Sequence, residues 1–263
     1  MMSATDIRKD ARVHLTGKWG KGALITLGYF VIEFVIGFIS GLFEENSAMS
    51  LIISIIQTII SVPLSFGLII AFMKLKRGEE VKAFDFLSLG FSNFKKSWVI
   101  AGNMIIKLIV PIVLVIVSVV IMYVGLFSSV ASYSMSILSG TSSSSGFTAL
   151  IIIGFIALFA SSIYAYVKQL FFVLSYNIAY DEPNLSGKEA VEKSQSLMQG
   201  NKGNYFVLTL SFIAWAILAC FTFGIGYFWL LPYMQVSMIC FYDHLAGKGE
   251  PEVEEKILEN NNN

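Results

Sequence analysis

Two charged side chains lie inside long apolar stretches of the sequence, where they could do chemistry within a membrane. Glu33 and Lys107 lie inside apolar segments that begin at Gly22 and Trp98, 11 and 9 residues from those starts, so we expect them at similar depth. A charge at the centre of a membrane helix costs about 2.5 to 3.5 kcal/mol, so it usually faces other helices and is paired. The pattern predicts a proton, ion or headgroup site at this pair. The alternatives are a buried ion pair that fixes helix register, or a lysine that reaches back to the membrane surface.

Three prolines near the middles of apolar stretches are expected to kink their helices: Pro63, Pro111 and Pro232. Proline has no backbone N–H, so a carbonyl one turn earlier needs another partner. Gln57, Asn103 and Gln235 could supply such partners. We count Gln57 and Gln235 with Glu33 and Lys107 as the candidate intramembrane polar site. Kinked helices with buried polar groups are typical of transporters, but they also occur in bundles that transport nothing.

Residues that usually carry catalysis are scarce. The only histidines are His14 and His244, and the two cysteines lie in apolar runs without metal-ligand spacing. Asp181 and Glu182 form one adjacent acidic pair, which Pro183 places in a turn before a helix. We therefore expect no cofactor, no metal site and no enzymatic activity, with an intramembrane enzyme using Asp181 or Glu182 as the least favoured alternative.

The composition requires elements that cross a membrane. Of the 263 residues, 56% are apolar and only 14% are charged, whereas a soluble domain has about 25% charged residues. Apolar stretches of about 20 residues, long enough to cross a bilayer as helices, number six. They run from 22 to 43, 51 to 73, 98 to 124, 147 to 174, 205 to 223 and 227 to 242. We expect an all-α polytopic bundle of six spans. Only residues 224–226 separate the last two, which we interpret as a hairpin rather than as one long segment broken by glycines.

Positive charges alternate between the connections. Sixteen of the 18 lysines and arginines precede the first span, follow the sixth, or lie between the second and third or the fourth and fifth. Cytoplasmic loops are enriched in lysine and arginine, so the pattern places both termini in the cytoplasm. The zero net charge gives no case for nucleic-acid binding.

Several connections are expected to have structure of their own. Residues 1–21 form an amphipathic lead-in within a single membrane domain, residues 1–248. Ser186 and Glu189 have the spacing of a capping box at the start of a surface helix that ends at Gly200. The aromatic and basic stretch 83–94 is typical of a membrane interface, although these faces could equally pack on the protein itself. Residues 125–146 are expected to be a serine-rich outer loop, and residues 249–263 a disordered acidic and asparagine-rich tail.

Small residues predict close contacts between helices. Gly37 and Gly41 form a GxxxG pair, and a stripe of small residues follows the fourth span. The stripe consists of Gly154, Ala157, Ser161 and Ala165. We expect both to serve contacts within the chain rather than a dimer.

Four segments in order along the chain resemble a bacterial integral-membrane family known as domain of unknown function 975. They are IRKDARVHLTGKWGKGALITL, PLSFGLIIAFMKLKRGEEV, YDEPNLSGKEAVEKSQSLMQGNK and FTFGIGYFWLLPYMQVSMICFYDHL. The chain is also distantly similar to the membrane portion of some glycerophosphodiester phosphodiesterases. The resemblance implies a bacterial cytoplasmic-membrane protein, and it supplies no catalytic residues.

Two functions remain open from the sequence. The first is non-enzymatic binding or transport of a lipid, ion or small solute. The second is a membrane scaffold or accessory subunit that docks a partner or anionic lipid through its basic cytoplasmic helices. Membrane lipids are the expected partners, together with a protein partner or a second copy of the chain.

Overall fold

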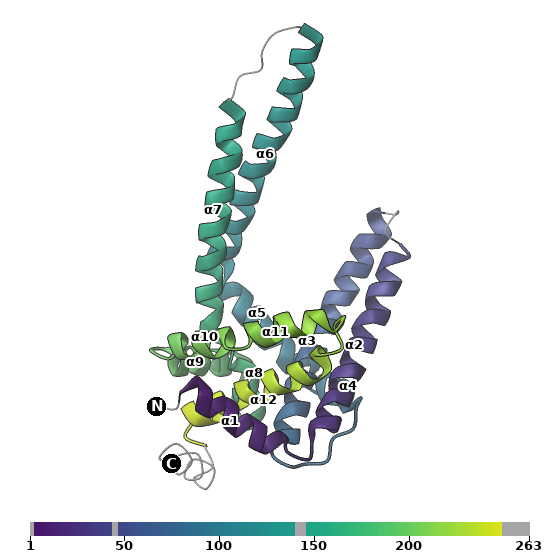
Figure 1. Cartoon of the computed structure of the whole chain (residues 1–263), viewed down its shortest axis with the longest axis vertical. Helices are drawn as coiled ribbons and strands as arrows, with labels where there is room; N and C mark the ends of the chain where they lie inside the picture. The colour runs from purple at the N-terminus through teal and green to yellow at the C-terminus, as the bar shows by residue number, and fades with distance from the viewer. Residues whose placement is uncertain (1–2, 44–46, 140–145, 249–263) are drawn as a thin grey trace. The chain divides into compact units, whose positions relative to one another are not determined.

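The computed structural model describes residues 3–43, 47–139 and 146–248, and all regular structure in these residues is helical (Figure 1). The expected tail, residues 249–263, lies outside the described residues. The helices are α1 (Ala4–Leu15), α2 (Trp19–Gly41), α3 (Ser47–Lys76), α4 (Asp85–Ser92), α5 (Phe94–Lys107), α6 (Ile109–Ser139), α7 (Gly146–Gln169), the 3₁₀ turn η1 (Leu170–Phe172), α8 (Ser175–Asp181), α9 (Gly187–Met198), α10 (Lys202–Leu210), α11 (Ile213–Phe221) and α12 (Tyr227–Leu245).

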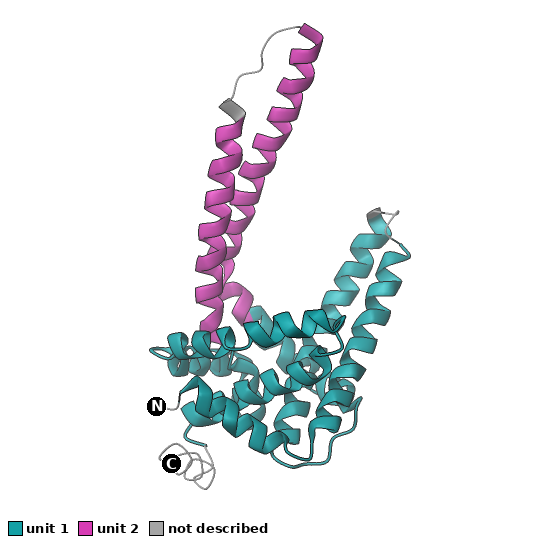
Figure 2. Cartoon of the chain, viewed as in Figure 1, with its two compact units in different colours: residues 1–102, 173–263 teal, residues 103–172 magenta. Residues whose placement is uncertain are grey.

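The chain divides into two compact units (Figure 2). Unit 1 combines residues 1–102 with residues 173–263, and unit 2 consists of residues 103–172. Unit 1 is therefore built from two separate stretches of sequence. The boundary falls inside α5, which the sequence treats as the start of one apolar span.

Unit 2 is dominated by the hairpin of α6 and α7. A methyl group added at Gly154 would lie 2.8 Å from the backbone of Met122, so the two helices approach closely there. The hydroxyls of Ser118 and Ser161 meet across the same interface at 3.4 Å. These contacts confirm that Gly154 and Ser161 of α7 serve packing within the chain. Gly37 and Gly41, in contrast, have open space beside them.

The predicted serine-rich loop is wrong for most of its length, because α6 continues as helix to Ser139. Hydroxyls along this stretch donate to carbonyls one turn earlier, as Ser129 does to Gly125 and Ser134 does to Val130. The serines are thus accommodated within the helix. Residues 140–145 of the predicted loop lie outside the described residues.

The expected kink at Pro111 takes the form of a break between α5 and α6. Leu108 separates the two helices, and Pro111 is the third residue of α6. Proline cannot donate to the carbonyl four residues earlier, that of Lys107, and its ring crowds that carbonyl. This explains why α5 ends at Lys107.

Unit 1 consists of the α2–α3 hairpin, the first part of α5 up to Gly102, and a base formed by α1, α4 and α8 to α12 (Figure 1). In the base, α12 packs against α1, α2, α3 and α11. A methyl group at Gly22 would lie 3.0 Å from the ring of Pro232, so α2 and α12 touch at these residues. At Gly67 the approach to α4 is closer still, because an added methyl group would lie 2.0 Å from the carbonyl oxygen of Phe86.

Pro63 lies inside α3 and leaves the carbonyl of Ile59 without its usual helical donor. The indole N–H of Trp98 points to this oxygen at 3.4 Å. The expected need for a neighbouring donor is confirmed, although a tryptophan supplies it. Pro232 lies inside α12.

Among the described residues, five segments are long and apolar enough to cross a membrane, instead of the six expected. They are Trp19–Gly41, Ala48–Lys76, Ile109–Ser139, Thr148–Asp181 and Lys202–Phe221. The predicted sixth span corresponds to α12, which is not among them. The fifth is interrupted after Leu210, so α10 and α11 have 9 residues each. In Figure 1 they run across the base of unit 1 rather than along the α2–α3 hairpin.

Candidate functional site

A pocket of about 380 Å³ lies in the base of unit 1, between the start of α2 and the helices α11 and α12. It is lined by Arg12, Trp19, Trp215, Leu218, Ala219, Thr222, Gly226, Trp229, Leu230 and Tyr233. Three of the four tryptophans of the chain are in this list. Large aromatic walls around a volume of 300 to 1,000 Å³ are characteristic of small-molecule sites.

Contacts with neighbouring helices fix the orientation of the aromatic side chains that line the pocket. Trp19 packs on Tyr233 with ring centroids 6.0 Å apart, and the buried Phe212 lies edge-on to the same tyrosine at 5.2 Å. The Tyr233 hydroxyl donates to the Arg8 carbonyl of α1 at 3.3 Å. The side chains that face the pocket are therefore placed by contacts among α1, α2, α11 and α12.

Arg12 is the one charged residue among the lining residues. Arg12 is exposed, and its positive charge interacts electrostatically with the Tyr233 hydroxyl. The pocket thus combines apolar and aromatic walls with a single cation. Such an arrangement can hold an apolar chain and an anionic group of one molecule.

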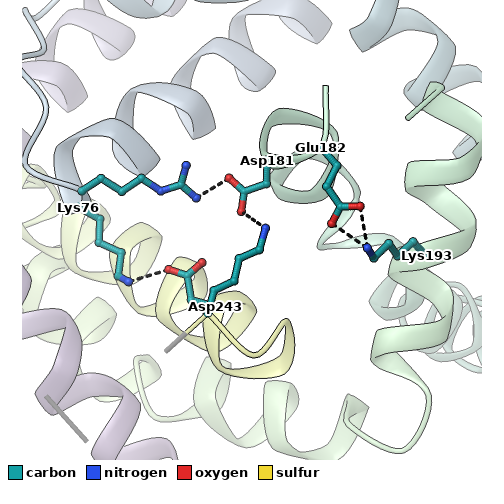
Figure 3. A network of polar contacts seen from close by, with 7 residues as sticks. Lys76, Asp181, Glu182, Lys193 and Asp243 are labelled. Carbon is teal, nitrogen blue, oxygen red and sulfur yellow. Dashed lines mark hydrogen bonds and ion pairs between the residues drawn. The ribbon is translucent and has the colours of Figure 1, made fainter. Parts of the chain in front are cut away.

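A buried ion pair lies at another point of the base, where α3 ends beside α12. Lys76 Nζ lies 2.6 Å from Asp243 Oδ2, and both side chains are at most 6% exposed (Figure 3). Burial raises the pKa of the Asp243 carboxyl, and the Lys76 ammonium offsets part of that rise. The pair joins two helices that are far apart in the sequence.

The acidic pair singled out in the sequence is held in ion pairs close by (Figure 3). Asp181 bonds to the Arg77 guanidinium and lies 3.0 Å from the ammonium of Lys248. Both oxygens of Glu182 accept hydrogen bonds from Lys193 at 2.7 Å. These contacts tie the end of α8 to the ends of α3 and α12 and to the middle of α9.

Three residues of the predicted intramembrane polar site belong to unit 1, namely Glu33, Gln57 and Gln235. Glu33 is half-buried on α2 and interacts with the hydroxyl of Tyr29, one turn earlier. Gln57 accepts a hydrogen bond from Ser40 at 3.2 Å, seven residues or roughly 10 Å further along α2. Gln235 is half-buried on α12, one turn from the residue that contacts Gly22.

Lys107 belongs to unit 2, so its pairing with Glu33 stays a prediction.

A comparison with known protein families identifies the same family as the four sequence segments quoted above. Residues 1–248 match the model of the family described as a protein of unknown function, DUF975. The chain belongs to this family. No curated protein and no solved structure matches the chain, so the distant resemblance to glycerophosphodiester phosphodiesterases stays a prediction.

The four segments that resemble DUF975 meet in the base of unit 1. They contribute α1, the end of α3, the turn after α8 together with α9, and α12. They supply the charged cluster formed by Lys76, Arg77, Asp181 and Asp243. The family resemblance therefore coincides in space with the charged cluster and the aromatic pocket. Sequence reasoning missed the pocket, although tryptophans at the ends of apolar stretches could have indicated it.

Proposed function

We propose that this DUF975 protein is a non-enzymatic membrane protein that binds an anionic amphiphile, such as an acidic phospholipid, in the Trp19–Trp215–Trp229 pocket. The observation that carries this proposal is the single arginine beside an aromatic and apolar cavity of about 380 Å³. The apolar and aromatic walls suit an acyl chain, and Arg12 favours a negative headgroup. The non-enzymatic assignment is supported by Asp181 and Glu182, whose carboxylates are held by ion pairs.

We further propose that the protein lies in a bacterial cytoplasmic membrane with both termini in the cytoplasm. Packing of α1 against α12 supports this orientation, because it brings the first and last described helices to the same face of unit 1. Helices α10 and α11 are each about 14 Å long, less than half of the hydrocarbon core. Their length and direction support a position along the interface, with the α2–α3 and α6–α7 hairpins as the crossing elements.

Native mass spectrometry of the protein released from detergent tests the ligand. The protein is loaded with phosphatidylglycerol or with phosphatidylcholine of the same acyl chains. We expect one phosphatidylglycerol to be retained in preference to phosphatidylcholine. Arg12→Ala removes a charge-assisted contact of roughly 1.5 kcal/mol, which lowers that preference about tenfold, whereas Arg12→Lys keeps most of it.

A second variant separates the pocket from the charge. Leu218→Trp fills part of the pocket with a larger side chain, so it should abolish retention of both lipids. Leu218 is 57% exposed, so the variant should stay folded. Lys188→Ala, an exposed cation on α9, is the control and should change neither. Equal retention of both lipids by the wild type, unchanged in Leu218→Trp, contradicts the proposal.

A second function, docking of a partner or anionic lipid surface, is favoured by α4 and the start of α5. Phe84, Phe91 and Phe94 are at least 40% exposed, next to the exposed Lys95. Lys96 instead donates to the carbonyls of Ala179 and Pro183 at 2.7 and 3.0 Å. Lys95→Glu should therefore weaken salt-sensitive association with anionic vesicles or a cross-linked partner. Association unchanged by this charge reversal contradicts docking through α4.

The sequence-based alternative, an ion or solute site at Glu33 and Lys107, is kept as a proposal with its own test. Glu33→Gln should abolish a bound ligand or a flux without unfolding the protein. Unchanged flux in a folded variant contradicts it.

A further inference from the structure

Three side chains of metal-ligand type meet where α1 packs on α12. Asp10 and His14 lie one turn apart on α1, and Cys240 comes from α12. One ligand atom from each lies within 4.8 Å of the other two. His14 Nε2 is 3.1 Å from Asp10 Oδ1, and the Cys240 thiol contacts the same carboxylate. All three belong to unit 1.

The donor types and spacing suit a zinc-class ion. A carboxylate oxygen, an imidazole nitrogen and a thiolate are the groups that bind Zn²⁺, at about 2.0 to 2.3 Å. In a tetrahedral site these distances place ligand atoms roughly 3.3 to 3.7 Å apart. The observed cluster needs to contract by only about 1 Å. Residues four apart on a helix share one face, so Asp10 and His14 can bind the same ion.

The carboxylate has an unsatisfied atom in this cluster. Asp10 Oδ1 is buried, and within the described residues it has no counted hydrogen bond beside its 3.1 Å contact with the His14 imidazole. A buried acceptor whose hydrogen-bonding capacity is left unfilled is unfavourable. A coordinated cation would satisfy this oxygen.

Lys76 is the positive charge that a bound ion would have to tolerate, because it interacts with Asp10, Asp243 and Cys240. A divalent ion that displaces the Cys240 thiol proton adds one net positive charge. Repulsion from Lys76 is moderated because its ammonium is paired with Asp243 at 2.6 Å.

We propose that Asp10, His14 and Cys240 bind one divalent transition-metal ion of the zinc class. On binding, the Cys240 thiol releases its proton to solvent and binds the ion as a thiolate. The His14 imidazole coordinates the ion through the lone pair of a ring nitrogen. Three protein ligands leave one tetrahedral position for water. The ion would link α1 to α12, the first and last described helices.

Cobalt substitution tests the proposal on the full-length wild type in detergent. The protein is titrated with Co²⁺, and the near-ultraviolet thiolate-to-cobalt charge-transfer band is recorded. After loading with Zn²⁺ and removal of excess ion, the bound metal is measured by elemental analysis. We expect the charge-transfer band and about one equivalent of zinc. Lack of the band together with no retained zinc overturns the proposal without any variant.

The chain offers a matched control for two of the ligands, because it has two cysteines and two histidines. Cys240→Ser and His14→Gln should lose the zinc, whereas Cys220→Ser and His244→Gln should retain it. Circular dichroism and gel filtration show whether each variant is folded. Equal loss in the control variants, or retention in both ligand variants, contradicts the assigned ligands.

Discussion

At the scale of single residues, the Lys76–Asp243 pair is expected to be the contact most sensitive to removal of one partner. Lys76→Ala leaves the Asp243 carboxylate buried without its counter-charge. Such a loss costs about 3 to 5 kcal/mol, because one buried charge is left uncompensated. Urea unfolding in detergent, followed by circular dichroism, measures the change in the free energy of unfolding.

A neighbouring lysine provides the control. Lys74 lies 2.9 Å from Glu79, but these side chains are 27% and 44% exposed. Lys74→Ala should cost less than about 1 kcal/mol, as for other exposed ion pairs. Equal losses from the two substitutions contradict the burial argument.

The capping box of α9 gives a prediction for pH. Glu189 accepts from the Ser186 N–H at 2.7 Å, and the hydrogen bonds of Ser186 lower the pKa of Glu189 below its ordinary value of 4.5. The cap therefore stabilises α9 fully above pH 4.5 and is lost as pH falls through the lowered pKa. Unfolding of α9, followed by a probe on this helix, should become easier below that pH in the wild type.

Glu189→Gln should remove this part of the pH dependence, whereas Glu192→Gln on the same helix should keep it. An unchanged pH profile in Glu189→Gln shows that another group is responsible. Ser186→Ala is expected to cost about 1 kcal/mol of stability at neutral pH, as for other helix caps.

At the scale of helices, the contact between α3 and α4 tolerates no side chain at Gly67. Gly67→Ala places a methyl carbon 2.0 Å from a backbone oxygen, so the two helices must separate. Overpacking usually costs 1 to 3 kcal/mol, and a clash with backbone should reach the upper end of this range. Thermal unfolding of the purified variant measures the loss.

Gly37→Ala is the matched control within α2, because nothing lies within 4 Å of the added methyl group. Alanine favours helix over glycine by up to about 1 kcal/mol, so stability should be unchanged or slightly higher. A loss as large as that of Gly67→Ala shows that the effect does not come from contact with α4.

Structural features that are encoded within one or two turns of a helix could be predicted from the sequence. The Ser186–Glu189 capping box, the buried face of α1 and the small residues of α7 are all encoded within one or two helical turns. The serine-rich stretch was misjudged because composition does not show that serines can donate to carbonyls of their own helix.

At the scale of the whole molecule, the sequence could not predict contacts between distant segments. His14 and Cys240 look like isolated residues along the chain, and Lys76 is 167 residues from Asp243. Hydropathy also counts apolar residues without showing that α12 is buried in the base and that the α10–α11 segment is interrupted. The membrane class was therefore predictable, but the pocket, the charged cluster and the number of spans were not.

Cysteine labelling tests the proposed arrangement in the membrane. In a Cys220→Ser background, Ile225→Cys places a thiol between α11 and α12, at a residue that is 58% exposed. A membrane-impermeant maleimide should label it in inverted vesicles but not in intact cells, because we place these helices at the cytoplasmic face.

Lys188→Cys and Leu138→Cys serve as cytoplasmic and outer controls, since both residues are exposed. If Ile225→Cys is labelled together with Leu138→Cys from outside, α10–α11 and α12 cross the membrane as two spans, and the interfacial arrangement is wrong.

The division of unit 1 into two stretches of sequence affects how the protein is made. Asp243 comes 167 positions after Lys76, a stretch that takes roughly 8 to 33 s to synthesise at 5 to 20 residues per second. During this time Lys76 has no acidic partner, and α1 and α2 cannot yet pack against α12. The whole of unit 2 is translated before unit 1 can close, so α12, the last described helix, completes the base only after unit 2 has been made.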